Sequence, residues 1–189
     1  AISYLVDVYR RQIRAERNPM HLALYISFFP HLIAGPIIRY KDLLPQMKER
    51  QVSREQFSQG VRRFIIGLGK KVLIANTMAT VADQIFGLPP WDLSTGAAWL
   101  GIIAYTIQIY ADFSGYSDMA IGLAHMFGFR LLENFQYPYW SQSIRDFSRR
   151  WHISLSAWFR DYVYIPLGGN HSSRAMVAMN ILIVFFLCG

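Results

Sequence analysis

The sequence predicts an all-α, multi-pass membrane protein in which re-entrant and interfacial helices accompany the spanning ones. Hydrophobic residues make up 53% of the 189 residues and charged residues only 16%, whereas soluble domains carry about 25% charged residues. The apolar stretches follow helical spacing and alternate with short basic segments, as in membrane helices joined by cytosolic loops. The formal net charge of +7 is therefore assigned to those loops, and no motif for binding nucleic acid is present.

The N-terminal part combines a basic loop with an interrupted apolar segment. Residues 1–18 begin apolar and become basic, like the end of a membrane helix that runs into the cytosol. Residues 20–38 are apolar but contain Pro30 and the Gly35-Pro36 pair, and basic sequence flanks them on both sides. A segment that enters and leaves on the same side satisfies the positive-inside tendency, so residues 20–38 are predicted to be re-entrant and to line a site.

The middle of the chain is predicted to hold spanning helices. Residues 41–60 are polar and suit a surface helix or loop, and Ser53-Arg-Glu-Gln56 is a capping-box pattern for the next helix. Residues 61–87 are interpreted as an interfacial helix that continues into a membrane helix, because a lysine pair at 70–71 interrupts the apolar pattern. Residues 95–111 are uniformly apolar and form the clearest candidate for a span.

Two carboxylates interrupt the pattern after residue 111. Residues 95–129 are too long for one straight span at about 1.5 Å per residue, so a bend is predicted near Gly115. Small and ionisable residues on a membrane helix face other protein, and here they share one face: Gly115, Asp118, Gly122 and His125. Asp118 is therefore a candidate for a proton relay with His125 or for a clamp between helices.

The strongest candidate for chemistry is His152. Its unperturbed pKa lies near neutrality, which suits a group that accepts and releases a proton during catalysis. Arg149, Arg150 and Trp151 carry donors that can stabilise an oxyanion, and Asp146 can pair with either arginine at helical spacing. The helical spacing of aromatic and apolar residues predicts that His152 belongs to one helix, which ends before Pro166 and the Gly168-Gly169-Asn170 turn; the residues on its aromatic face are Trp151, Leu155, Trp158 and Tyr162.

Other interpretations of these residues remain open. His152 can instead form a hydrogen bond that holds two helices together. Ser156, one turn later, suggests a Ser–His nucleophile pair, but no orienting carboxylate or nucleophile elbow accompanies it, and a hydrogen bond to a preceding carbonyl is the preferred interpretation. No cluster has metal-ligand spacing, and no phosphate-binding glycine loop is present. We therefore expect no metal site and no tightly bound cofactor.

Three stretches of the sequence are similar to motifs of a known family. They are Arg149-Arg-Trp-His-Ile-Ser-Leu-Ser156 with Arg160-Asp-Tyr-Val-Tyr-Ile-Pro-Leu-Gly-Gly-Asn170, Phe28-Phe-Pro-His-Leu-Ile-Ala-Gly-Pro-Ile-Ile-Arg-Tyr40, and Asp112-Phe-Ser-Gly-Tyr-Ser-Asp-Met-Ala-Ile-Gly122. Together they closely resemble the membrane-bound O-acyltransferase family, and most closely the branch that O-acetylates bacterial alginate. The resemblance covers nearly the whole chain and implies an all-α, multi-pass protein of the bacterial inner membrane.

The resemblance also implies an incomplete catalytic centre in residues 1–189. His152 matches the earlier of two family histidines. The second histidine, generally credited as the essential one, lies in a Leu-Trp-His-Gly-like stretch of the helix after the Gly-Gly-Asn loop, which this resemblance places beyond Gly189. We accordingly expect residues 1–189 to be part of a single O-acyltransferase domain that is truncated at both ends and inactive by itself.

The function implied by the resemblance is acetyl transfer from an activated thioester toward hydroxyls of an exopolysaccharide such as alginate. The donor is acetyl-CoA or another acyl thioester, and the implied partners are periplasmic polysaccharide-acetylation proteins and membrane lipid. Two other classes compete with this function: an intramembrane transporter whose Asp and His residues relay protons, and a non-catalytic membrane scaffold. Transfer of a labelled acyl group that depends on His152 separates the first from both rivals.

Overall fold

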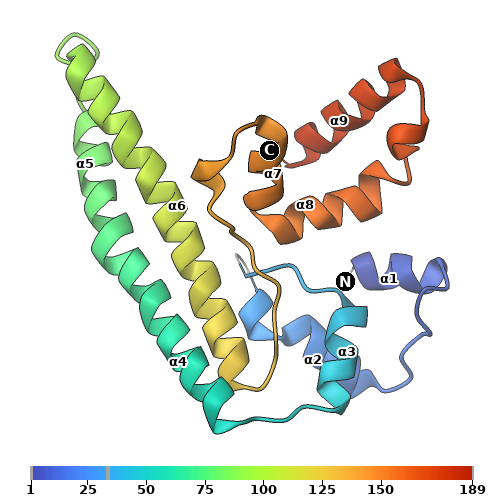
Figure 1. Cartoon of the computed structure of the whole chain (residues 1–189). Coiled ribbons are helices and arrows are strands. Elements are labelled where there is room, and N and C mark those ends of the chain that lie inside the picture. Colours follow the sequence, from blue (N-terminus) through green and yellow to red (C-terminus); the bar gives the residue numbers. More distant parts are fainter. Residues whose placement is uncertain (1, 33–34, 189) are drawn as a thin grey trace. The chain divides into compact units, whose positions relative to one another are not determined.

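Every regular element that the computed structural model describes, in residues 2–32 and 35–188, is a helix (Figure 1). This confirms the all-α class. The chain divides into two compact units, one made of Ala1–Phe28, Pro36–Glu49 and Leu132–Gly189 and the other of Phe29–Gly35 and Arg50–Leu131. We call them the His152 unit and the hairpin unit, after the candidate residue in the first and the shape of the second. A single domain over residues 1–189 stays a prediction.

The hairpin unit consists mainly of two long helical arms. Its elements, in chain order, are a 3₁₀ turn (Phe29–His31), α4 (Arg54–Gly69), a π-helical turn (Lys70–Ala75), α5 (Asn76–Phe86) and α6 (Thr95–Met126). The π-helical turn joins α4 to α5 without a break, and α6 returns alongside them (Figure 1). Ser53 Oγ accepts a hydrogen bond from the Gln56 N–H at 3.0 Å, which confirms the predicted N-cap of α4.

The two arms approach each other closely at two pairs of facing glycines. A Cβ atom on Gly67 would lie 2.6 Å from the carbonyl oxygen of Gly115, and one on Gly122 would lie 2.7 Å from that of Gly60. Such distances leave no room for a side chain, so these glycines allow the backbones to pack directly, as small residues do between membrane helices. The predicted inward orientation of Gly115 and Gly122 is confirmed.

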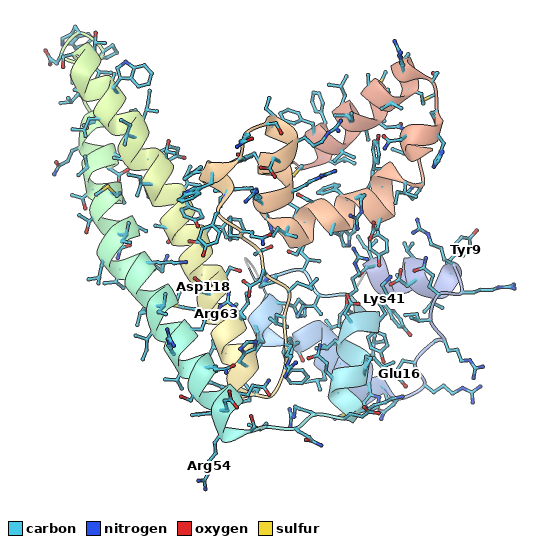
Figure 2. All side chains as sticks on the ribbon, viewed as in Figure 1. Tyr9, Glu16, Lys41, Arg54, Arg63 and Asp118 are labelled. Atoms are coloured by element: carbon cyan, nitrogen blue, oxygen red, sulfur yellow. The ribbon has the colours of Figure 1, made fainter. Side chains whose placement is uncertain are left out.

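Ion pairs also join the two arms. Asp118 on α6 accepts a hydrogen bond from Arg63 Nη2 at 2.9 Å (Figure 2) and another from Lys70 Nζ at 2.6 Å. Asp112 pairs with Lys71. Because Lys70 and Lys71 belong to the π-helical turn, the wider turn carries both ammonium groups to carboxylates on α6. Asp118 therefore clamps two helices together, which is one of the two roles predicted for it.

One expectation for the hairpin unit, the bend near Gly115, is wrong. α6 is one uninterrupted helix of 32 residues through Gly115, because both carboxylates are neutralised by cations of the facing arm and need not leave the helix. The lysine pair does not interrupt the hairpin arm, because the π-helical turn continues α4 into α5; which part of this arm lies at the membrane interface stays a prediction.

One of the two expected membrane helices, the one within residues 61–87, lies in a candidate span. By length and composition, Arg54–Phe86 is the one helix in the described residues that can cross a membrane, and Arg174–Cys188 is a shorter apolar helix. Residues 95–111, the clearest candidate in the sequence, do not stand out in the same way, because Thr, Gln, Tyr and Trp lower the hydropathy of that stretch.

The His152 unit is assembled from shorter helices. In chain order they are α1 (Ile2–Tyr9), α2 (Pro19–Ser27), α3 (Tyr40–Lys48), a 3₁₀ turn (Pro138–Trp140), α7 (Ile144–Arg150), α8 (Ile153–Phe159), a π-helical turn (Arg160–Tyr164), a 3₁₀ turn (Gly169–His171) and α9 (Arg174–Cys188). Tyr40 and Leu43 of α3 are fully buried. The rings of Tyr4 and Tyr25 meet the Tyr40 ring edge-on at centroid distances of 5.0 and 5.2 Å, so α3 forms the centre of this unit's core.

The apolar segment at residues 20–38 is interrupted as predicted. α2 has only nine residues, fewer than the roughly 20 that cross a bilayer, and a 3₁₀ turn around Pro30 follows it. Residues 33 and 34 lie outside the described part of the chain. Whether the segment enters and leaves on the same side of a membrane stays a prediction.

A buried carboxylate connects α1 to the segment that follows α8. The Asp7 side chain is fully buried, and the Tyr162 hydroxyl donates to its two oxygens at 2.8 and 2.9 Å. Burial, followed by the hydrogen bond to Asp7, raises the pKa of Tyr162. Arg39, which precedes α3, pairs with Asp161 at 2.7 Å, and its guanidinium lies 5.3 Å from the Tyr162 ring centroid. These contacts hold the backbone that follows His152 against α1 and α3.

Candidate active site

His152 lies between two helices and not inside one, so the prediction of a continuous helix is wrong. α7 ends at Arg150 and α8 begins at Ile153. Trp151 is extended, with φ −98° and ψ 126°, and His152 is left-handed, with φ 45° and ψ 56°. No proline or glycine marks this break, which is why the spacing of the aromatic residues concealed it.

A left-handed conformation at a non-glycine residue costs about 1–3 kcal/mol and persists only where surrounding contacts impose it. At His152 the contacts come from Asn134, a residue of the coil before α7 whose exposed fraction is 1%. The Asn134 carbonyl accepts from the Ile153 N–H at 3.0 Å, and its side-chain Oδ1 lies 3.1 Å from His152 Nδ1. Asn134 therefore holds both the backbone and the imidazole at the break.

Ser154 completes the cluster around Asn134. The Ser154 N–H and hydroxyl both donate to Asn134 Oδ1, at 3.2 and 2.8 Å. The Ser154 Oγ in turn accepts from the Ile37 N–H at 2.9 Å. A chain of hydrogen bonds therefore runs from the segment before α3 through Ser154 and Asn134 to the imidazole of His152.

The backbone donor in this cluster determines the tautomer of His152. Because the Ser154 N–H can only donate, the Asn134 atom that it contacts is the amide oxygen and not the amide nitrogen. That oxygen can only accept, so His152 Nδ1 carries the proton. In the neutral imidazole, Nε2 then holds the lone pair and is the nitrogen that can accept a proton.

The surroundings also favour the neutral ring. Burial lowers the pKa of His152 below its ordinary value of 6.5, because a charged imidazolium loses hydration in a half-buried site. Burial therefore favours the neutral ring, in which Nε2 is the basic nitrogen. A general base requires this protonation state before the reaction begins.

The predicted neighbours of His152 have other contacts. Arg150 Nε donates to Asp146 Oδ1 at 2.9 Å within α7, and the hydrogen bond from Arg150 is the largest cause that lowers the pKa of Asp146. The Trp151 ring stacks on Phe147 at a centroid distance of 5.6 Å and meets Phe135 edge-on at 5.0 Å. Asp146 and Arg150 thus stabilise α7, and Trp151 packs α7 against the preceding coil.

The remaining candidates are distributed over both units. Arg149 is exposed on α7. Asp118 belongs to the hairpin unit, where Arg63 and Lys70 bind its carboxylate. Ser156 donates from Oγ to the Ser148 carbonyl at 3.1 Å, which fits the preferred interpretation of a hydroxyl bonded to a carbonyl.

A cavity of about 350 Å³ opens beside Ser156. Besides Ser148 and Ser156 it is lined mainly by aromatic and aliphatic side chains of α8, the following π-helical turn and α9, namely Phe159, Tyr164, Ile181, Val184 and Phe185. No group of three or more His, Cys, Asp or Glu side chains in the described residues is placed to hold a metal ion. The absence of a metal from the complete protein stays a prediction.

Asn134 and Ser154 are the site residues that sequence reasoning missed. Asn134 precedes His152 by 18 residues, in a coil without periodicity, so no spacing rule connects the two. Ser154 lies within the quoted motif, but helical spacing assigned it no role. A polar residue beside a left-handed histidine becomes informative only when the backbone conformation is known.

Sequence comparison identifies the family of this chain. Residues 10–189 match the model of MBOAT, the membrane-bound O-acyltransferase family. The chain belongs to this family. Family membership confirms the resemblance carried by the three motifs and makes the protein one of a membrane-bound class.

The chain is similar to several curated MBOAT relatives. It is 53% identical over its whole length to the probable alginate O-acetylase AlgI of Pseudomonas syringae pv. tomato, of which it covers 36%. It is 44% identical to the peptidoglycan O-acetyltransferase of Helicobacter pylori, of which it covers 41%. Over 79% of its length it is 35% identical to the teichoic acid D-alanyltransferase of Bacillus subtilis, of which it covers 39%. The chain thus spans well under half the length of these relatives.

Proposed function

We propose that the protein containing this chain transfers an acetyl group from an acyl thioester to a hydroxyl of a bacterial exopolysaccharide such as alginate. The family supports transfer of an acyl group to oxygen. The names of the relatives support a cell-envelope polymer as the acceptor. Identity is higher to the alginate O-acetylases, at 52–53%, than to the peptidoglycan O-acetyltransferase, at 44%, which favours alginate or a related polymer.

The observation that carries the proposal is the contact of His152 Nδ1 with Asn134 Oδ1, which leaves Nε2 as the basic nitrogen of the neutral ring. In the proposed step, Nε2 accepts the proton of the acceptor hydroxyl while the hydroxyl oxygen bonds to the carbonyl carbon of the thioester. The carbon–sulfur bond then breaks, and the proton passes from Nε2 to the departing sulfur, which leaves as a thiol. Asn134 Oδ1 accepts from Nδ1–H throughout and stabilises the imidazolium that forms.

The other site residues receive supporting roles in this proposal. Asp146 and Arg150 position α7, and Trp151 fixes the coil that carries Asn134. Arg149 is the proposed donor to the oxyanion, because it is exposed and lies three residues before His152 in the sequence. The role proposed for Asp118 is to clamp the arms of the hairpin unit.

The proposal places the complete protein in the inner membrane as a multi-pass protein. Residues 20–38 form a re-entrant segment in this arrangement, and the basic loops face the cytosol. The donor, acetyl-CoA or another acyl thioester, then arrives from the cytosol and is consumed as a substrate, with no tightly bound cofactor. Periplasmic polysaccharide-acetylation proteins are the proposed partners that complete transfer to the polymer.

The function is tested with the full-length protein in vesicles supplied with radiolabelled acetyl thioester and alginate oligosaccharide. We expect label to accumulate in an alkali-labile ester on the acceptor, in proportion to the protein added. A parallel measurement of proton flux in the same vesicles tests the transporter alternative. Proton flux without any labelled ester would contradict the proposal.

Replacing Asn134 with aspartate should change the pH dependence of the reaction. The carboxylate still accepts from His152 Nδ1 and Ser154, but its negative charge favours the imidazolium and raises the pKa of His152 by about one unit or more. Because the base must be neutral to accept a proton, kcat/KM falls as the pH drops. This acid limb of the pH profile should move to a pH about one unit higher in the variant. The wild-type limb should lie below pH 6.5, the ordinary pKa of the ring.

Gln136→Glu is the matched control, since it adds the same charge to an exposed position of the same coil. Its acid limb should coincide with that of the wild type. Thermal unfolding shows whether each variant is folded. A change in the pH profile of a folded variant can then be assigned to the pKa of His152. An unchanged limb in a folded Asn134→Asp variant would show that Asn134 does not control the ionisation of His152.

A further inference from the structure

A cavity beside the coil that joins α1 to α2 has no part in the proposed reaction. It has a volume of about 1050 Å³ and is lined by residues of this coil, of α1 and of the C-terminal half of α3. Figure 1 shows the coil bowing away from α3. The Tyr40 hydroxyl anchors the coil to α3 by donating to Glu16 at 2.6 Å (Figure 2 labels Glu16). All of these residues belong to the His152 unit.

The lining carries a large excess of positive charge. Its cations are Arg11, Arg14, Arg17 and Lys48, and Glu16 is its one acidic residue. Within residues 2–32 and 35–188, the side chains of these four cations form no ion pair or hydrogen bond. Like charges around one opening repel each other, and a bound anion relieves that repulsion.

Glu16 does not neutralise these cations, because it is bound elsewhere. Its carboxylate accepts from the Tyr40 hydroxyl at 2.6 Å and from the Asn18 N–H at 2.9 Å, and it lies 3.3 Å from His21 Nδ1. The hydrogen bond from Tyr40 is the largest cause that lowers the pKa of Glu16, to about 2. Glu16 is thus an anion that is already bound by α2, α3 and the Asn18 backbone.

Apolar side chains line the same cavity, among them Val8, Ile13 and Leu44. Membrane topology accounts for a basic loop, but it does not require the cations to surround a cavity with an apolar lining. A ligand that matches both features has a phosphate group attached to hydrocarbon. Anionic phospholipids have this chemistry, and basic segments next to membrane helices are where their headgroups are bound.

We propose that this cavity binds the phosphate group of an anionic phospholipid. Arg14 on the coil and Lys48 on α3 contact the phosphate from two sides, and the acyl chains lie against Val8, Ile13 and Leu44. Coenzyme A also carries phosphate esters, so the test must distinguish a lipid from a nucleotide. The proposal is independent of acetyl transfer, because the full-length protein can bind lipid whether or not it is an acetyltransferase.

The test measures binding of short-chain phosphatidylglycerol to the full-length protein in neutral detergent by calorimetry. Short-chain phosphatidylcholine, which has no net charge, should bind at least tenfold more weakly. Each Lys or Arg near an anionic headgroup contributes about fivefold in affinity, so Arg14→Gln/Lys48→Gln should weaken phosphatidylglycerol binding roughly 30-fold. Added salt should weaken wild-type binding further, since screening acts on exposed charges.

The matched control is Arg54→Gln/Arg174→Gln, which removes the same charge from exposed positions outside the cavity. We expect its affinity to stay within about twofold of the wild type, and the charge-conserving Arg14→Lys/Lys48→Arg variant should retain binding. Stronger binding of coenzyme A or inorganic phosphate than of lipid, also lost in Arg14→Gln/Lys48→Gln, would support a phosphate site but assign it to a soluble ligand. Equal losses in both double variants, or no loss in Arg14→Gln/Lys48→Gln, would overturn the proposal.

Discussion

Replacing His152 in the full-length protein is expected to lower acetyl transfer by about 10²- to 10⁴-fold, the usual contribution of a positioned general base. The lone pair on Nε2 is lost, and the acceptor hydroxyl must then transfer its proton to water. His152→Asn is the more informative substitution, because asparagine adopts the left-handed conformation more readily than alanine. It removes the base while preserving the backbone at φ 45°.

The measurement is turnover of labelled acetyl thioester by His152→Asn and His152→Ala, with membrane insertion checked for each. His171→Ala is the control, because His171 is an exposed histidine in the 3₁₀ turn before α9. That variant should keep wild-type turnover. If His152→Asn also kept wild-type turnover, His152 would have only the structural role of joining α7 to α8.

The second large effect is expected in the hairpin unit. A glycine-to-alanine substitution there should lower the free energy of unfolding at Gly67 but raise it at Gly69. A Cβ atom at Gly67 would lie 2.6 Å from the carbonyl oxygen of Gly115, so Gly67→Ala must push the two arms apart. Overpacking of this kind lowers the free energy of unfolding by about 1–3 kcal/mol. The separation would also lengthen the nearby Asp118–Lys70 ion pair, which measures 2.6 Å in the native hairpin.

Gly69 provides the control on the same helix, because a Cβ atom there meets no atom within 4 Å. Alanine is the better helix former, so Gly69→Ala should raise the free energy of unfolding by about 0.5–1 kcal/mol. Thermal unfolding midpoints of the two variants in the same detergent provide the comparison. A Gly67→Ala variant as stable as Gly69→Ala would show that the arms do not pack through these glycines.

Local signals in the sequence determined much of the fold. Helical spacing and composition predicted the all-α class, Ser53 marked the start of α4, and Pro30 marked the interruption after α2. The pairing of small residues with a carboxylate at Gly115, Asp118 and Gly122 predicted the inward face of α6. Each signal acts within one or two helical turns, so a single sequence suffices to detect it. The family motifs likewise identified His152 as the candidate residue.

Only the tertiary structure decided the chemistry at His152. The hydrogen bonds that impose its left-handed backbone and its tautomer link it to Asn134, 18 residues away, and Ser154 to Ile37, 117 residues away. α6 stays helical through two carboxylates because cations on the facing arm neutralise them, 41 and 48 residues away in sequence. Periodicity and capping describe neighbours along the chain and carry no information about such partners. The sequence therefore identified the histidine, and the long-range hydrogen bonds determined which of its nitrogens can accept a proton.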